Sequence, residues 1–142
     1  MRLFLDCEYN DFKGPLISMA LVAEDGQDWY EVTYCDNPSP WVAEQVMPIL
    51  MRPPISMFEM QRSLQYYLEQ FDSIHIVADW PEDIAHFCQT LITWPGHRID
   101  TPPLTMEVLR IDSKSDLPHN ALYDARGLRD AVLSMTPNPC IR

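Results

Sequence analysis

The sequence predicts an α/β fold: a mixed five-stranded sheet whose first three strands form an antiparallel meander and whose two faces are both covered by helices. Two observations predict it. Segments rich in strand-forming residues and separated by turn signals fill residues 1–34. Beyond them, amphipathic helical patterns alternate with short apolar strand patterns, an order that is typical of crossover connections across a sheet.

The predicted meander depends on two turns. The segment 10–15 is rich in Asn, Gly and Pro, and the Asp25-Gly26 pair is a strong hairpin signal. Turns this short join neighbouring strands that run in opposite directions. The three strands are expected at residues 1–9, 16–24 and 28–34.

The rest of the chain carries four helical patterns and two strand patterns. Pro48 should disturb the first helix, and Ser56 with Glu59 has the spacing of a capping box at the start of the second. Asp79 and Glu82 have the same spacing at the start of the third. Helices are expected at residues 41–50, 57–70 and 120–134, with a further one that opens within 79–83 and ends at 94–96, and strands at 73–78 and 105–111.

Size and composition predict one folded domain, residues 1–142. Hydrophobic residues make up 46% of the chain, which suits a packed core. No apolar run approaches the roughly 20 residues that span a bilayer, and the first residues lack the pattern of a secretion signal. The four cysteines have no Cys-x-x-Cys spacing, so reduced thiols are expected rather than a zinc site. These features predict a soluble, cytoplasmic protein with no membrane partner.

The formal net charge of −11 argues against one class of function. A chain this acidic is a poor candidate for broad, salt-driven binding along nucleic acid. It is still compatible with an enzyme that holds only the end of a nucleic-acid chain.

The first strand ends in two carboxylates. Because strand side chains alternate, Asp6 and Glu8 share one face while Cys7 points to the other. The carboxylates repel each other, and a cation between them relieves the repulsion; hard oxygen ligands suit Mg²⁺ or Mn²⁺. An Asp-x-Glu triplet alone is a weak signal, since most are solvated strand ends.

A second constellation lies at the start of the last helical pattern, where His119 and Asp124 flank Ala121. The small residues Ala121 and Gly127 would let this helix approach the sheet and bring Asp124 near the first strand. Each residue also has an ordinary interpretation. A histidine before a helix is often a loop residue, and Asp124 or the mid-chain Asp83 could be a solvated acid favoured by a helix dipole.

Taken together and in this order, the acids and the histidine resemble the pattern of the DEDDh 3′–5′ exonucleases, the DnaQ-like nucleases of the ribonuclease H-like fold. The resemblance runs from Leu3 to about Val132. The small size and the segment beginning at Trp80 look most like the small bacterial 3′–5′ exoribonucleases that prefer adenylate-rich RNA. The residues that match the family pattern are Asp6, Glu8, Asp83, His119 and Asp124.

This resemblance implies hydrolysis of single-stranded RNA from its 3′ end with two Mg²⁺ or Mn²⁺ ions. Asp6 would bridge both ions, while Glu8 and Asp124 would each hold one. The family pattern puts Asp83 on the more loosely held ion. His119 would be the general base for the attacking water, because the unperturbed histidine pKa of ~6.5 suits proton transfer near neutral pH.

Substrate contacts are expected from aromatic side chains beside the site. Trp80 could stack on a base, a contact worth ~1–3 kcal/mol, or pack under the start of its helix. Tyr9 and Phe12 follow the metal-binding strand and could pack on the terminal nucleotide, although core or hairpin packing is the stronger interpretation for Phe12. Homodimers are common among similar small exonucleases, so a second copy is a partner that the resemblance allows.

Three other functions stay open at this point. They are a 3′–5′ DNA exonuclease of the proofreading or repair type, a nucleic-acid-binding protein with a vestigial site, and a metal-dependent hydrolase of a small phosphate ester. The sequence shows no separate polymerase-binding tail, which favours a free-standing ribonuclease over a proofreading subunit. All five positions of the family pattern are filled, which argues against a vestigial site.

The mid-chain acids Asp79 and Asp83 compete for one role. Asp79 directly precedes the third helix, where its side chain could accept hydrogen bonds from free backbone amides, worth ~1 kcal/mol. Asp83 lies one turn into that helix, and the family resemblance places its second-motif Asp there. The prediction is therefore that Asp83 binds metal and Asp79 caps the helix.

Overall fold

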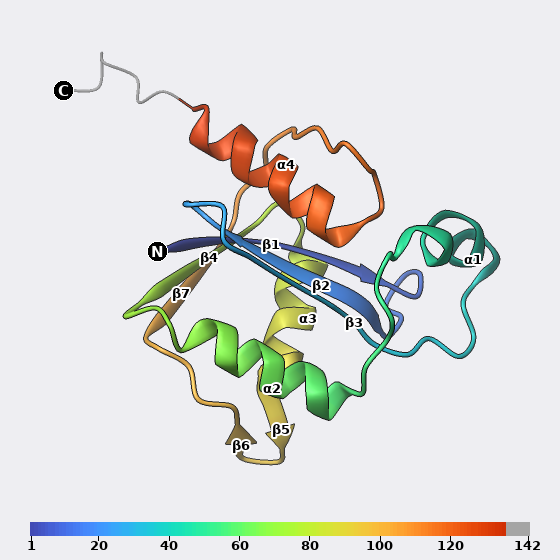
Figure 1. The fold of residues 1–142 in the computed structure, drawn as a ribbon, viewed down its shortest axis with the longest axis horizontal. Helices are drawn as coiled ribbons and strands as arrows, with labels where there is room; N and C mark the ends of the chain where they lie inside the picture. Colours follow the sequence, from blue (N-terminus) through green and yellow to red (C-terminus); the bar gives the residue numbers. More distant parts are fainter. Residues whose placement is uncertain (136–142) are drawn as a thin grey trace.

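The computed structural model describes residues 1–135, and a five-stranded sheet lies at its centre (Figure 1). The strands lie side by side in the order β3-β2-β1-β4-β7. Their bounds are β1 (Arg2–Tyr9), β2 (Leu16–Ala23), β3 (Asp28–Val32), β4 (Ile74–Ala78) and β7 (Leu104–Val108).

Strand directions in this sheet are mixed. β1 pairs antiparallel with β2, with Asp6 opposite Ala20, and β2 pairs antiparallel with β3. β4 runs parallel to β1, and β7 runs parallel to β4. The predicted α/β class, the mixed five-stranded sheet and the meander at its start are confirmed.

Alternate side chains of the sheet enter two cores. Leu3 and Leu5 of β1 belong to the core under α2 and α3, whereas Phe4 belongs to the core under α4. Helices therefore cover both faces, as predicted (Figure 1). The covering helices are α2 (Met57–Leu68), α3 (Pro81–Leu91) and α4 (Ala121–Leu133). Because side chains alternate along a strand, Asp6 and Glu8 share the α4 face with Phe4.

The predicted first helix is shorter than expected. It forms α1 (Pro40–Gln45) and then a separate 3₁₀ turn, η1 (Met47–Ile49). Pro48 lies in that turn, where it lacks the N–H that a continuing α-helix would need. The predicted start of α2 is confirmed, because the Ser56 hydroxyl accepts a hydrogen bond from the Glu59 backbone N–H at 3.2 Å.

A small hairpin after α3 was not expected from the sequence. β5 (Ile92–Trp94) pairs antiparallel with β6 (His97–Arg98), and Gly96 has a φ of +75° in the turn between them. Residues 94–96, which the sequence predicts to end a helix, contain Pro95 and Gly96, and this pair also reverses the chain. Within residues 1–135, no helix combines the length and the apolar character needed to cross a membrane.

Candidate metal centre

β1 extends past its neighbour β4 and presents its C-terminal half to two helices. The parallel register between these strands ends at Phe4. Beyond that point the first turn of α3 lies close to β1, and the Cys7 backbone N–H donates to Oδ1 of Asp83 at 3.3 Å. Asp83 is almost fully buried, so this bond fixes its carboxylate beside the C-terminal half of β1.

Asn120 fixes the start of α4, from which Asp124 reaches β1. The Asn120 side-chain oxygen accepts from two backbone N–H groups of the first helical turn, at 3.0 and 3.3 Å. Its side-chain nitrogen donates to the Ile49 carbonyl at 2.9 Å. One buried amide therefore caps α4 and ties it to the segment that follows α1.

Small residues in α4 have two different uses. Ala121 and Ala125 share a core cluster with Ala20 of β2, which keeps α4 close to the sheet. A Cβ at Gly127 would lie 2.1 Å from the carbonyl oxygen of Lys114. The prediction that Gly127 serves the approach to the sheet is therefore wrong, because it makes room for the loop that precedes α4.

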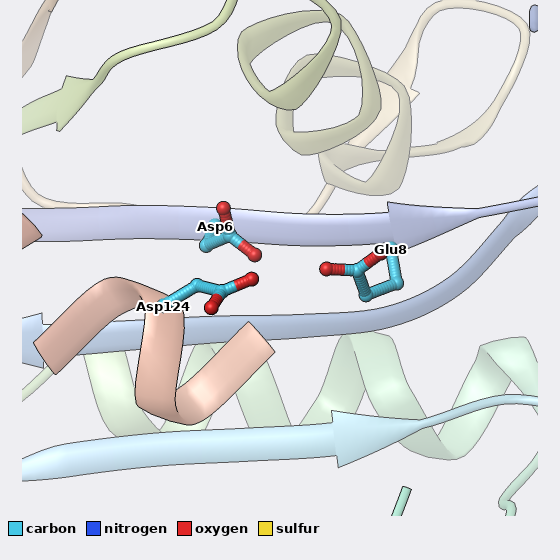
Figure 2. Close-up of side chains that lie close together, drawn as sticks. All are labelled: Asp6, Glu8 and Asp124. Carbon is cyan, nitrogen blue, oxygen red and sulfur yellow. The ribbon is translucent and has the colours of Figure 1, made fainter. Parts of the chain in front are cut away.

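Three of the predicted site residues converge on one point. Asp6, Glu8 and Asp124 each offer a carboxylate oxygen, and these oxygens all lie within 4.8 Å of one another. Figure 2 shows the three side chains pointing toward one another from β1 and α4. We call them the β1–α4 group. Residues far apart in the sequence thus form one set of oxygen ligands.

A second group shares Asp6 with the first. Oxygens of Asp6, Asp79 and Asp83 also lie within 4.8 Å of one another. We call these residues the β1–α3 group. Trp80, and not Asp79, occupies the N-cap position of α3, and the Trp80 side chain makes no capping hydrogen bond. The prediction that Asp79 caps α3 is therefore wrong; its carboxylate lies with the metal-binding candidates instead.

Burial and mutual repulsion raise the pKa values of these acids. For Asp6, burial raises the pKa most, followed by the charges of Asp83 and Glu8. Burial and Asp124 raise the pKa of Glu8 to about 9. Burial and Asp79 raise the pKa of Asp83 to about 8, and burial also raises the pKa of Asp79. Without a counter-charge, the site favours protonated carboxyl groups near neutral pH.

The donor set fits hard divalent cations. Oδ2 of Asp6 is buried and has no hydrogen-bond partner among the described residues, although buried carboxylate oxygens normally have one. This oxygen belongs to the residue that both groups share. Carboxylate clusters of this kind suit Mg²⁺ or Mn²⁺, and a cation would remove the cost of keeping the acids ionised together.

His119 lies directly before α4 in a constrained position. Its φ of +74° is left-handed, and its backbone N–H donates to Oδ2 of Asp124 at 3.2 Å. Its ring packs edge-on against Trp41 of α1, with ring centres 5.0 Å apart and an interplanar angle of 82°. The backbone of His119 is thus tied to one metal-binding candidate, while its ring is held by a side chain of another element.

The site acids other than Asp124 line a hollow of about 440 Å³ whose rim is aromatic. We call it the metal hollow. Phe12 is 76% exposed there, so the interpretation of Phe12 as a core or hairpin-packing residue is wrong. Trp80 is 56% exposed, and its indole N–H donates to Glu82 at 3.4 Å. The lining carboxylates are Asp6, Glu8, Asp11, Asp79, Glu82 and Asp83, and the lining aromatic residues are Tyr9, Phe12, Trp41 and Trp80.

Two members of the site were missed from the sequence. Trp41 gave no signal there, because an exposed-face tryptophan on a short helix shows no partner until the fold brings His119 against it. Asp79 did give a signal, since it directly follows a buried strand, but the capping spacing offered an alternative explanation. Of the predicted substrate contacts, Tyr9 and Trp80 both line the metal hollow.

Comparison with known proteins finds two similar sequences from two strains of Mycobacterium tuberculosis, both named 3′-5′ exoribonuclease. Each is 29% identical over an alignment of 148 residues, which covers 89% of this chain and 88% of the relative. No family model matches the sequence. The similarity therefore extends over nearly the whole of both chains.

Proposed function

We propose that this protein is a metal-dependent 3′–5′ exoribonuclease of the DEDDh type. The observation that carries the proposal is the pair of carboxylate groups that share Asp6. Two adjacent sites for hard cations, joined by one bridging acid, are what phosphodiester hydrolysis by two ions requires. The RNA substrate and the polarity come from the similar proteins named 3′-5′ exoribonuclease.

Each of the two carboxylate groups would hold one Mg²⁺ or Mn²⁺ ion. Glu8 and Asp124 complete the β1–α4 group, while Asp79 and Asp83 complete the β1–α3 group. When bound, such ions supply charge stabilisation for the attacking and leaving oxygens of the phosphodiester. The protein keeps the ligand oxygens together before the ions arrive, through the Cys7–Asp83 hydrogen bond and the N-terminal cap of α4.

His119 is assigned as the general base. It takes a proton from the water that attacks the terminal phosphodiester, and the products are a nucleoside 5′-monophosphate and an RNA shortened by one residue with a new 3′-hydroxyl. The contact with Trp41 limits the orientations of the imidazole ring, and the bond to Asp124 fixes its backbone beside the β1–α4 group. A positioned base of this kind contributes typically ~10²–10⁴-fold to the rate.

The shape and charge of the metal hollow favour a chain end over a long strand. Its six carboxylates repel a phosphate backbone unless divalent ions neutralise them. The exposed rings of Phe12 and Trp80 offer flat apolar faces for unstacked bases. Tyr9 and Trp80 are the proposed contacts of the terminal nucleotide.

The proposal is tested by digesting a 5′-labelled single-stranded RNA and the DNA of the same sequence, with Mg²⁺, Mn²⁺ or excess EDTA. The expected result is a ladder from full-length RNA downward, with no products in EDTA or with the variant Asp6→Asn. Blocking the 3′-hydroxyl should stop the reaction. Cleavage of a circular RNA would indicate an endonuclease, and preferential digestion of the DNA would point to a DNA exonuclease.

A further inference from the structure

A second hollow of about 450 Å³ adjoins the metal hollow on the outer side of α3. The side chains of Lys13, His86 and Gln89 line it, and Glu82 lines both hollows. We call it the Lys13 hollow. A contact between two rings also links the metal hollow to the Lys13 hollow. Tyr9 of the metal hollow stacks on His86 of the Lys13 hollow, with ring centres 4.9 Å apart.

The two hollows differ in charge. The metal hollow is lined by six carboxylates and by no lysine or arginine. Lys13 is the one lysine or arginine among the described residues that line either hollow. A phosphate that extends from the metal hollow into the Lys13 hollow therefore meets a cationic side chain there. Cationic side chains are what phosphate groups of a nucleic-acid backbone require at a binding surface.

The loop that carries Lys13 holds a defined shape. Asp11 and Lys13 have φ values of 66° and 58°, in the left-handed region that is disfavoured for residues with a side chain. The loop is closed by hydrogen bonds from Asn10 N–H to the Pro15 carbonyl and from Gly14 N–H to the Asp11 carbonyl. Left-handed residues of this kind persist where surrounding structure enforces them, and they cluster at ligand-binding sites.

Further contacts fix the position of this loop and of the Lys13 side chain. The side chain of Asn10 donates to the Asn37 carbonyl and accepts from the Ser39 backbone N–H, both at 2.8 Å, so the loop is attached to the segment that leads into α1. The Lys13 ammonium lies 5.3 Å from the ring centre of Phe12. Its position is therefore set beside a ring that lines the metal hollow.

We propose that the Lys13 hollow is a binding subsite for the RNA strand upstream of the terminal nucleotide, in which Lys13 pairs with a phosphate that is not cleaved. The inference rests on the proposed function. A terminal nucleotide with a free 3′-hydroxyl has no phosphate beyond it, so every uncleaved phosphate lies on the 5′ side of the scissile one. Upstream of the carboxylates, the strand follows the outer side of α3 past His86 to Lys13.

The test compares two substrates. The dinucleoside monophosphate of adenosine contains only the scissile phosphate, whereas a tetranucleotide also contains uncleaved ones. For Lys13→Gln we expect kcat/KM on the tetranucleotide to fall about 2- to 5-fold, the effect of one exposed ion pair, with no measurable change on the dinucleotide. The slope of log kcat/KM against log salt should become shallower by about 0.7.

Arg62→Gln is the matched control. It removes one positive charge from a side chain that also lies over an aromatic ring, that of Phe58, but on α2 and away from both hollows. It should change neither substrate's kinetics, and Lys13→Arg should retain most of the wild-type rate on the tetranucleotide. Equal losses on both substrates, or no loss on either, would overturn the subsite. Failure of the wild-type protein to cleave any RNA would instead overturn the proposed function, and the subsite with it.

Discussion

The two carboxylate groups that share Asp6 are held together in different ways. In the β1–α3 group, Asp83 is buried and accepts a hydrogen bond from the Cys7 backbone, so the protein itself fixes it. In the β1–α4 group, the backbone N–H of His119 donates to Asp124, and burial together with the charge of Asp124 raises the pKa of Glu8. A backbone N–H thus holds one acid of each group, but the acid held in the β1–α3 group is buried, whereas Asp124 in the β1–α4 group is only partly buried.

The arrangement of the acids predicts how metal ions and pH affect the stability of the site. In the β1–α3 group, the hydrogen bond from the Cys7 N–H to Asp83 does not depend on the protonation of Glu8, because Glu8 takes no part in it. Both groups contain acids whose pKa values are raised, so each needs a proton or a cation to relieve the repulsion between its carboxylates. Substitution of the acids one at a time tests how each group contributes to metal binding and stability.

The largest effect is expected for Asp6→Asn, because Asp6 is the one acid common to both groups. Turnover should fall by at least ~10³-fold, since both cation sites lose a charged ligand. The metal-free variant should melt at the same temperature as wild type or higher, because repulsion with the neighbouring acids is removed. A variant that keeps a tenth of wild-type activity would show that Asp6 is not shared between two ions.

The next effects compare Asp83→Asn with Asp79→Asn. We expect a loss of at least ~100-fold for Asp83→Asn and about 10-fold for Asp79→Asn, because Asp83 is the more rigidly held ligand. Neither melting temperature should fall appreciably: an asparagine oxygen can still accept from Cys7, and Asp79 does not cap α3. A clear loss of stability in Asp79→Asn with full activity would restore the capping role.

A smaller effect concerns pH and the metal-free protein. The folded-state pKa values of Glu8 and Asp83, about 9 and about 8, lie above the ordinary values of 4.5 and 3.8 for these side chains. The folded state therefore binds more protons, and this contribution to stability is complete below about pH 4 and is lost as pH rises through 8 to 9. Melting curves in EDTA should shift to lower temperature between about pH 6 and about pH 9.

Saturating Mg²⁺ should reduce the change of melting temperature with pH. Glu8→Gln should also reduce it, because glutamine does not titrate. If the wild type and Glu8→Gln show the same pH dependence in EDTA, then Glu8 is not the group that couples protonation to folding.

The smallest effect is expected at Trp41, whose ring holds His119 edge-on beside the β1–α4 group. Trp41→Ala should lower kcat about 3- to 10-fold, the worth of one aromatic contact, whereas Trp41→Phe should retain most of it. The measurement is a separate determination of kcat and KM on RNA. A rise in KM with unchanged kcat would mean that Trp41 contacts the substrate rather than orienting the histidine.

The fold followed from the sequence where local signals and tertiary packing agree. Alternation in residues 1–34 and the Asp25-Gly26 turn predicted the meander, and the register places Asp6 and Glu8 on one face as their spacing requires. The β5–β6 hairpin was missed because a Pro-Gly pair terminates a helix and reverses a chain equally well. Local chemistry alone does not decide between these outcomes.

The candidate site was predictable to the extent that its members lie at element ends. Asp6, Glu8 and Asp124 meet because β1 and α4 carry them to the same face. The role of Asp79 was misjudged, since capping spacing is a local property and the proximity of Asp79 to Asp6 is a tertiary one. The Tyr9–His86 and Trp41–His119 contacts also join distant segments, so no sequence pattern could have indicated them.

Two metal sites that share Asp6 are tested most directly by counting the ions bound to the protein. Equilibrium dialysis with Mn²⁺ gives this number for the wild type, Asp124→Asn and Asp83→Asn. The shared-acid arrangement predicts about two ions per wild-type chain. It predicts about one in each variant, because each variant damages one group and leaves the other intact. A single ion in the wild type, or two ions retained in both variants, would contradict the assignment of the acids to two adjacent metal sites.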